Sequence, residues 1–330
     1  MQKMSHPVDP LDPSTSFEEK ASSIFTYQYG KCVVYSRFCE ALGIRTGDFT
    51  DTDEIPLLPV RAFKESRIST LKNRSELFFQ SSGTSDMKRA VHEVPDPELY
   101  RKSIFQGFDY FYPDNPVILS YTPGYLANPH SSLIWMLSEL IKRDRSGLSK
   151  FLDSEEALDQ EFWDQLNTGD RNVILFGAAF ALVDLVEKKK IKLPLNCIVI
   201  ETGGMKTHRR EIPRNELHQV LADGFGINDN QIHSEYGMCE LLSQAYASGN
   251  KLFQPVPWMK ISIRNPDNPL ETQKPGNEGL IGVIDLANMY SCSFILTEDK
   301  GVEEEPGSFQ ILGRWNPENL RGCNFLVDSD

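Results

Sequence analysis

The spacing of apolar and polar positions predicts helices at the start of the chain and alternating strands and helices in its middle. Apolar residues recur at helical spacing through 17–43. Short β-branched runs predict strands at 117–121, 173–176 and 197–201, and the helical patterns at 132–143 and 179–190 lie between them. Strands separated by helices imply right-handed crossovers and a largely parallel sheet.

The pattern changes in the second half of the chain. A helix is expected around 215–223, followed by a strand, a turn and another helix within 231–247. After residue 250 two strands without an intervening helix, at 279–286 and 293–301, predict a smaller β-rich part. In the N-terminal part of the chain, a proline-containing segment at 55–64 is expected to be extended, and a strand is expected at 76–80.

Composition places the chain among ordinary globular proteins. It has 330 residues, of which 40% are hydrophobic and 25% charged, and a formal net charge of −13. Because no strong run of Lys and Arg occurs, nucleic acid is not expected as a partner. The N-terminus lacks the apolar segment of a secretory signal, and the longest apolar run, 173–183, is too short to span a bilayer. A cytoplasmic protein is therefore expected.

The cysteines and histidines do not predict a metal site. Six cysteines occur without a CxxC pair, and the six histidines include no HExxH motif. In a cytoplasmic chain of this size the cysteines are expected to be reduced and mostly buried.

The stretch FFQSSGTSDMKRA, residues 78–90, concentrates small donors around one glycine. Glycine lets the backbone approach a bulky anion, hydroxyls add donors, and a lysine adds a positive charge. The Walker pattern is absent, because Met87 rather than glycine precedes Lys88. The alternatives are a phosphate-binding loop and an ordinary solvated turn. The candidate phosphate ligands are Ser81, Ser82, Gly83, Thr84, Ser85 and Lys88.

Three further stretches have the residue types of a nucleotide site, and each also has a plain structural interpretation. ETGG at 201–204 could lie against a flat ring or form a simple turn. SEYGMCE at 234–240 could flank a base and hold Mg²⁺, or Ser234 could cap a helix. ILTEDKG at 295–301 could bind two ribose hydroxyls or form a hairpin turn.

Together with the Gly-Arg-Trp stretch at 313–315, these motifs resemble, in order, those of the adenylate-forming superfamily of acyl- and aryl-CoA synthetases. The resemblance implies an α/β fold with the adenylate-forming large-domain architecture: mainly parallel sheets flanked by helices, with a smaller β-rich part at the C-terminal end. It also implies ATP and Mg²⁺ as cofactors. The implied nucleotide-binding residues beyond the phosphate loop are Gly203, Gly204, Glu235, Tyr236, Gly237, Met238, Asp299 and Arg314, and Glu240 is the implied metal ligand.

The chain departs from the superfamily pattern at several positions. Cys239 stands where threonine is usual, and Glu298 stands where the ribose motif has glycine. The mobile domain that usually follows the hinge, with its adenylation lysine, is expected to be absent, and Lys206 is the nearest candidate to replace that lysine. We expect a large domain at 1–312 and a hinge-like tail at 313–330.

A chain with LPVRAFK before the phosphate loop, LFGAAFAL in the middle, GGMK after a strand and RGC near its end is similar to the LuxE-type acyl-protein synthetases. That resemblance implies activation of a fatty acid as acyl-adenylate and transfer to Cys323, then to an acyl-reductase partner. A thiolate is a capable acceptor, and nearby arginines favour it. Cys323 could instead be a small buried hydrophobe. His130 could face the substrate carboxylate or cap the following helix.

The sequence therefore predicts an acid–thiol ligase. Two alternatives stay open: a ligase that loads coenzyme A or a carrier protein, and a catalytically silent subunit of a larger synthase. The sequence does not indicate which acid is activated or the oligomeric state.

Overall fold

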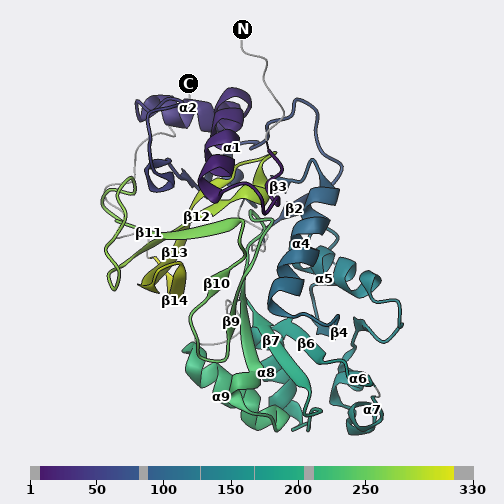
Figure 1. The fold of residues 1–330 in the computed structure, drawn as a ribbon. Coiled ribbons are helices and arrows are strands. Elements are labelled where there is room, and N and C mark those ends of the chain that lie inside the picture. Colours follow the sequence, from purple (N-terminus) through teal and green to yellow (C-terminus); the bar gives the residue numbers. More distant parts are fainter. Residues whose placement is uncertain (1–7, 82–87, 127, 167, 204–211, 316–330) are drawn as a thin grey trace. The chain divides into compact units, whose positions relative to one another are not determined.

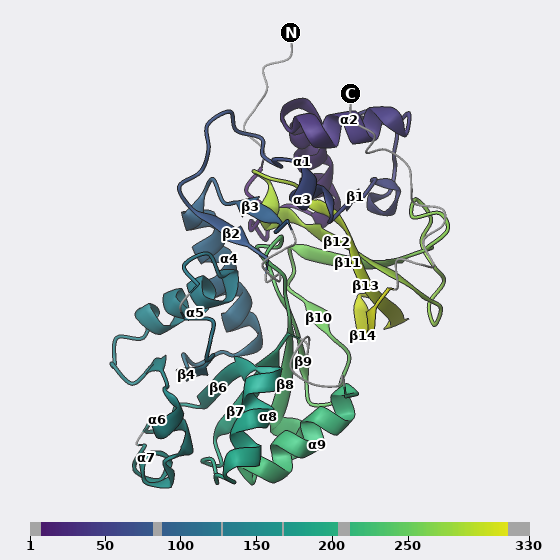
Figure 2. The same cartoon turned by 180° about the vertical axis from the view of Figure 1, so that it is seen from behind.

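The computed structural model describes residues 8–81, 88–126, 128–166, 168–203 and 212–315. The chain forms two compact units, seen in Figures 1 and 2, which we describe separately. Unit 1 contains the described residues of 1–103, 238–243 and 255–330, and unit 2 those of 104–237 and 244–254. Two elements cross the boundary: helix α4, Pro97–Phe111, and the short strand β10, Gln254–Pro255.

Unit 2 has a mainly parallel sheet whose order in the described chain is β10-β9-β8-β7-β6-β4-β5. The pairs from β5 to β8 are parallel, and β9 runs antiparallel to β8. Its strands are β4 Val117–Tyr121, β5 Lys150–Phe151, β6 Val173–Ala178, β7 Cys197–Thr202, β8 Ile232–Tyr236 and β9 Ala245–Ser248. Its helices are α5 Ser132–Arg143, α6 Ser154–Leu158, α7 Gln160–Gln165, α8 Ala179–Lys188, α9 Arg214–Phe225 and the 3-10 turn η2 Asp229–Gln231.

The core of unit 2 explains why its strands read as continuous apolar runs. Every residue of β4 and β6 is buried, as expected for a parallel sheet covered by helices. Helices α8 and α9 follow β6 and β7 and contribute Leu182, Leu185, Leu221 and Phe225 to the same buried cluster. The parallel register brings the carboxyl ends of β6, β7 and β8 to one edge of the sheet, where ligands of open α/β sheets bind.

Unit 1 is built on a second sheet, mostly antiparallel, of order β1-β13-β12-β11 with β14 paired to β13. The strands β2 and β3 form a separate antiparallel ribbon. Its strands are β1 Leu58–Pro59, β2 Phe78–Gln80, β3 Val91–Glu93, β11 Met259–Arg264, β12 Glu278–Asp285, β13 Phe294–Glu305 and β14 Ser308–Arg314. Its helical elements are α1 Phe17–Lys31, α2 Val33–Ala41, η1 Thr52–Glu54, α3 Ala62–Glu65 and η3 Leu286–Asn288.

The helical pattern at 17–43 is divided into two helices. Ser16 caps α1, its hydroxyl accepting from the backbone N–H of Glu19, and Cys32 then adopts an extended conformation that separates α1 from α2. Phe25 of α1 and Tyr35 of α2 pack on Phe294 of β13 with ring centroids 5.9 and 5.6 Å away. The break lets both helices place an aromatic ring on the same strand.

Two local predictions are wrong. The end of the segment 55–64 is helical rather than extended, because α3 turns to bury Phe63 after β1 has ended at Pro59. The second half of 231–247 is the strand β9 rather than a helix, since Ala245 pairs with Tyr236 of β8 and the chain returns along the sheet. Pairing with a neighbouring strand overrides local propensity here. The other predicted strands and helices are confirmed, with small shifts of their ends.

The described residues of the predicted tail end at Trp315, whose N–H donates to the Glu298 carbonyl oxygen over 2.9 Å. The prediction of one large domain at 1–312 and a tail at 313–330 stays a prediction, since 316–330 lie outside the described residues. In the described part of the chain, every helix is too short or too polar to cross a membrane.

Candidate functional site

The two ends of the predicted phosphate loop meet at Ser81 and Ala90 in unit 1, and we call this pair of residues the neck of the loop. Strand β2 leads into the loop and β3 leaves it. The Ser81 N–H donates to the Ala90 carbonyl oxygen over 3.1 Å, and the Ala90 N–H donates to Ser81 Oγ over 3.0 Å. Lys88 is exposed, with its Nζ 3.5 Å from the carboxylate of Glu65. Four other predicted phosphate ligands lie outside the described residues: Ser82, Gly83, Thr84 and Ser85.

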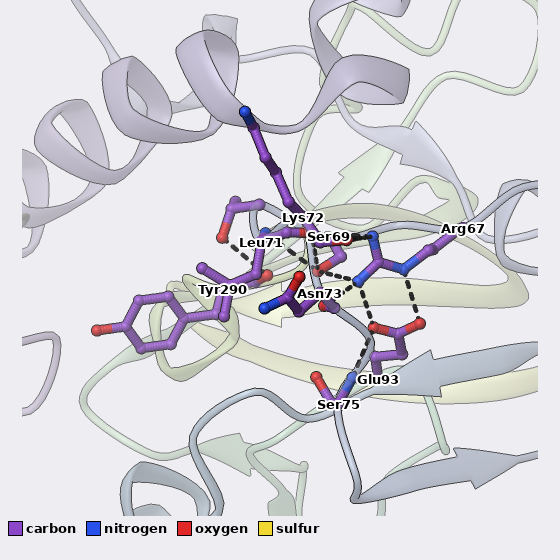
Figure 3. Close-up of polar contacts among 9 residues, drawn as sticks. Arg67, Ser69, Leu71, Lys72, Asn73, Ser75, Glu93 and Tyr290 are labelled. Carbon is purple, nitrogen blue, oxygen red and sulfur yellow. Dashed lines mark hydrogen bonds and ion pairs between the residues drawn. The ribbon is translucent and has the colours of Figure 1, made fainter.

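An arginine that no sequence motif indicated fixes the base of this loop. Arg67 donates from Nε and Nη2 to the two oxygens of Glu93, each over 2.7 Å. Its remaining N–H groups reach the carbonyl oxygens of Leu71 and Asn73. The Glu93 carboxylate also accepts the Ser75 N–H over 3.2 Å. Figure 3 shows the guanidinium between the carboxylate and the residues of 69–73, with Ser75 next to the carboxylate.

The ion pair between Arg67 and Glu93 is largely shielded from water. The side chain of Glu93 is 6% exposed, and hydrogen bonding from Arg67 holds its pKa below the ordinary value. Glu93 is the last residue of β3. The ion pair between Arg67 and Glu93, which we call the clamp, therefore fixes the strand that leaves the predicted phosphate loop. No local sequence pattern indicates this pair, because Arg67 and Glu93 are 26 residues apart in the chain.

The predicted metal ligand Glu240 is buried in a turn of unit 1. Its exposure is 5%, and burial raises the pKa of its carboxyl, while the charges of Arg314 and Lys64 act in the opposite direction. The turn starts at Met238, whose carbonyl oxygen accepts the Leu241 N–H over 3.1 Å.

The predicted ribose motif and hinge come together on two paired strands. Asp299 of β13 lies opposite Arg314 of β14 in the register, and Arg314 Nε donates to Asp299 Oδ1 over 2.9 Å. Arg314 Nη1 also lies 3.6 Å from a carboxylate oxygen of Glu298. The hairpin-turn interpretation of Asp299 is wrong, because the turn between the two strands is at Gly307, eight residues further along.

In unit 2, the carboxyl ends of β7 and β8 carry the predicted base-binding residues. Gly203 follows β7 with a φ of 75°, a conformation that favours glycine, and it is exposed. Thr202 Oγ1 donates to the carboxyl group of Glu235 on the neighbouring strand. Burial raises the pKa of Glu235 to about 7, with a further rise from the charge of Glu201 and an opposing effect of the Thr202 hydrogen bond.

The residue after Tyr236 lies against the carboxyl group of Glu235, so a side chain there would displace that group. A Cβ on Gly237 would lie 2.4 Å from the Glu235 carboxyl oxygen Oε1, closer than atoms pack. Tyr236 ends β8 with 7% exposure, and its ring meets Phe253 edge-on with centroids 6.3 Å apart. The alternative in which Ser234 caps a helix is wrong, because Ser234 lies inside β8.

The remaining predicted residues are only partly described. The backbone N–H of His130 donates to Asn128 Oδ1 over 3.0 Å, and the cap of α5 is Ser131, whose hydroxyl accepts the Ile134 N–H. The interpretation of His130 as the cap is therefore wrong, and its contact with substrate stays a prediction. Three predicted residues lie outside the described part of the chain: Gly204, Lys206 and Cys323.

The described residues hold no cluster of three or more His, Cys, Asp or Glu side chains suited to a metal ion. A single buried carboxylate such as Glu240 nevertheless fits Mg²⁺, since this cation keeps several waters and takes further oxygen ligands from nucleotide phosphates.

Comparisons with known proteins agree with the motifs. The model of the family "Acyl-protein synthetase, LuxE" matches residues 140–329. A long-chain-fatty-acid–luciferin-component ligase from Aliivibrio fischeri is 24% identical over 93% of this chain and 88% of its own length. A second ligase of this name, from Photorhabdus luminescens, is 35% identical over 68 residues, which cover 20% of this chain and 58% of that protein.

Solved structures show the same fold at low identity. A 2-hydroxyisobutyryl-CoA ligase in complex with 2-HIB-AMP and CoA has a TM-score of 0.64 at 13% identity, over 95% of this chain and 81% of that one. ATP-bound MatB from Rhodopseudomonas palustris has a TM-score of 0.53 at 14% identity. That match covers 74% of this chain and 49% of MatB, so the chain spans about half of MatB. The predicted fold class is confirmed.

Proposed function

Since the chain belongs to the LuxE acyl-protein synthetase family, we propose that it activates a long-chain fatty acid with ATP and transfers the acyl group to a thiol. Family membership confirms the prediction of an acid–thiol ligase. The fatty acid as substrate follows the name of the relative from Aliivibrio fischeri. The identity of the thiol and the roles of single residues are our proposals.

The contact between Asp299 and Arg314 is the observation that best supports a nucleotide site in this chain. These residues belong to two motifs that are separate in the sequence, and the β13–β14 pair brings them into contact in unit 1. Asp299 can accept hydrogen bonds from two ribose hydroxyls, and Arg314 can stabilise negative charge beside it. The same unit contains the neck of the phosphate loop and the buried carboxylate of Glu240.

The proposed reaction has two steps, adenylation of the acid and transfer of the acyl group to a thiol. A carboxylate oxygen of the acid attacks the α-phosphorus of ATP, and pyrophosphate leaves with the electrons of the broken P–O bond. A thiolate then attacks the carbonyl carbon of the acyl-adenylate, and AMP leaves. Adenylation is needed because a free carboxylate is a poor electrophile, whereas AMP is a good leaving group.

Each proposed residue either neutralises charge on the substrates or holds part of a substrate in position. Lys88, with the hydroxyls of the loop, binds the β- and γ-phosphates, and Tyr236 with Gly203 flanks the adenine. Glu240 would hold Mg²⁺, which neutralises phosphate charge when bound. Lys206 would supply a further cation during adenylation, and His130 would face the carboxylate of the acid.

The adenylation step is tested by ATP–pyrophosphate exchange with a panel of fatty and aryl acids. Asp299→Ala should lower acid-dependent exchange on the order of 10²-fold, as for the loss of a charge-assisted contact in a water-excluded site. Asp109→Ala is the control, because Asp109 also pairs with an arginine, Arg143, over 2.8 Å but has no proposed role. Wild-type exchange in a folded Asp299→Ala variant would remove Asp299 from the nucleotide site. A wild-type protein without exchange would favour the silent-subunit alternative.

The acceptor is tested separately with a radioactive fatty acid and ATP. If Cys323 carries the acyl group, Cys323→Ser should keep pyrophosphate exchange and lose hydroxylamine-sensitive labelling of the protein. An acyl-reductase is then the expected partner. If the wild type forms acyl-CoA or loads a carrier protein without labelling itself, the alternative ligase function is correct. The expected cytoplasmic location stays a prediction.

A further inference from the structure

His92 is a buried residue of unit 1 between the phosphate loop and the turn that carries Glu240. It is the middle residue of β3, two positions after Ala90 at the neck of the loop, and it is 0% exposed. Phe79 of β2 lies directly opposite, and the ring of Phe63 meets His92 edge-on at 5.6 Å. These contacts fix the imidazole plane, so the ring moves with the strand that leaves the loop.

The ring nitrogens of His92 reach two other segments of unit 1. Nδ1 lies 2.7 Å from the carbonyl oxygen of Cys239, the residue before Glu240. Nε2 lies 2.9 Å from Asn288 Oδ1 and 2.9 Å from Ser291 Oγ. Burial lowers the pKa of His92 to about 4, so the ring is neutral at pH 7 and carries one proton. We assign that proton to Nδ1, which donates to the Cys239 carbonyl oxygen at the shorter distance of 2.7 Å, and Nε2 then accepts from the Ser291 hydroxyl.

Asn288 completes the link to the turn. Its Nδ2 donates to the carbonyl oxygen of Glu240 over 2.7 Å, and its Oδ1 lies 2.7 Å from Ser291 Oγ. Gln28 of α1 donates to the Asn288 carbonyl oxygen over 3.1 Å, which fixes the backbone of η3 as well. Two successive carbonyl oxygens of the turn, at 239 and 240, are therefore each bound by a buried side chain.

We propose that His92 is a positioning residue for the carboxylate of Glu240, tying the turn that bears it to the strand leaving the phosphate loop. The proposal rests on the proposed function, because it assigns Glu240 to Mg²⁺ and the loop to the phosphates. A cation shared by a carboxylate and a phosphate needs the two held at a constant separation. Residues that orient metal ligands from behind typically change metal affinity or activity 10- to 100-fold when replaced.

The matched pair His92→Asn and His92→Gln tests the link. The amide N–H₂ of asparagine can occupy the place of Nδ1 and donate to the Cys239 carbonyl, whereas glutamine places its amide near Nε2. Acid-dependent pyrophosphate exchange is measured against Mg²⁺ concentration, together with thermal unfolding. We expect the Mg²⁺ midpoint to rise about tenfold in His92→Gln and by a clearly smaller factor in His92→Asn.

His233→Gln is the control. His233 also has both ring nitrogens in hydrogen bonds, Nδ1 with the Tyr112 hydroxyl and Nε2 with Ser248 Oγ, each over 3.0 Å. It lies in unit 2, as do Tyr112 and Ser248. The control should lower the midpoint of thermal unfolding without changing the Mg²⁺ midpoint.

Equal Mg²⁺ midpoints in wild type, His92→Gln and His233→Gln would overturn the proposal and leave His92 a residue of the core alone. If His92→Gln yields no folded protein, Asn288→Asp is measured in the same way. This substitution replaces the donor to the Glu240 carbonyl with an acceptor of the same size. An unchanged Mg²⁺ midpoint in Asn288→Asp also overturns the proposal. A wild-type protein without exchange contradicts the proposed function instead, so the two failures are distinguishable.

Discussion

Replacing Arg67 tests the clamp at the base of the phosphate loop. Arg67→Ala removes both hydrogen bonds to Glu93 and the bonds to the carbonyl oxygens of Leu71 and Asn73. The carboxylate of Glu93 is left with the Ser75 N–H as its remaining contact of this cluster. The change therefore leaves a buried negative charge without its cation.

The size of the effect follows from the burial of the two partners. Breaking a buried ion pair by removing one partner costs about 3–5 kcal/mol, because the other charge stays desolvated. The side chain of Arg67 is 32% exposed, whereas that of Glu93 is 6% exposed, so water can enter where the guanidinium was and the lower end applies. The carbonyl groups of the exposed segment 71–73 can bond to water and add little. We expect a loss of about 3 kcal/mol in the free energy of unfolding.

Thermal unfolding of the full chain measures this loss. For a cooperative unit of 150–250 residues, 3 kcal/mol corresponds to a fall of roughly 6–12 °C in Tm. Arg101→Ala is the control: Arg101 forms a surface pair with Glu98 one helical turn away, which should contribute well under 1 kcal/mol. A Tm loss in Arg67→Ala no larger than in Arg101→Ala would refute the reasoning from burial.

The same pair makes a pH-dependent contribution. Hydrogen bonding from Arg67 lowers the pKa of Glu93 in the folded protein, so its stabilisation is present above the ordinary pKa of 4.5 and is lost as the pH falls through the lowered folded value. The stability difference between wild type and Glu93→Gln should shrink as urea denaturation is repeated from pH 7 towards pH 3. A difference that stays constant over this range contradicts the assignment.

Three further substitutions test the site. Glu240→Gln keeps the shape but removes the charge, so more Mg²⁺ should be needed for half-maximal pyrophosphate exchange; an unchanged Mg²⁺ titration would remove Glu240 from the metal site. Gly237→Ala should lower Tm and slow exchange, because its Cβ would meet the Glu235 carboxyl oxygen at 2.4 Å, and a fully active, equally stable variant would contradict this geometry. Glu235→Gln should become more stable than wild type as the pH rises from 5 to 8. Burial raises the folded pKa of Glu235 to about 7, so ionisation penalises the folded wild type by up to about 3 kcal/mol, and parallel pH profiles would argue against a buried acid.

Elements with a strong period were predictable, and contacts between distant segments were not. Helix α5 was predicted with its observed ends, and β4, β6 and β7 read as buried runs because parallel strands are apolar on both faces. Strand β9 was misread because its apolar residues fit a helical face equally well, and only its pairing with β8 decides the outcome. Short apolar segments are ambiguous for this reason.

The candidate site shows the same division. Motif order was sufficient to propose that Asp299 and Arg314 serve one nucleotide, but their direct contact depends on the register of β13 and β14, which includes a bulge beside Lys300. A shift of one residue would turn one of the two side chains to the other face of the sheet. Arg67 was missed because its carboxylate partner, Glu93, is 26 residues away and no local pattern links them.

The alternation of side chains along β3 explains how this three-residue strand can support two different features. His92 faces the turn at Cys239 and Glu240, and Glu93, its neighbour on the opposite face, binds Arg67. The two networks share no side chain, so their substitutions should affect different quantities: Arg67→Ala mainly the free energy of unfolding, and His92→Gln mainly the Mg²⁺ midpoint. Stability losses in the double variant should add within about 0.5 kcal/mol. A larger deviation would mean that the two faces are coupled through the backbone of β3, and that the clamp and the metal turn respond to each other.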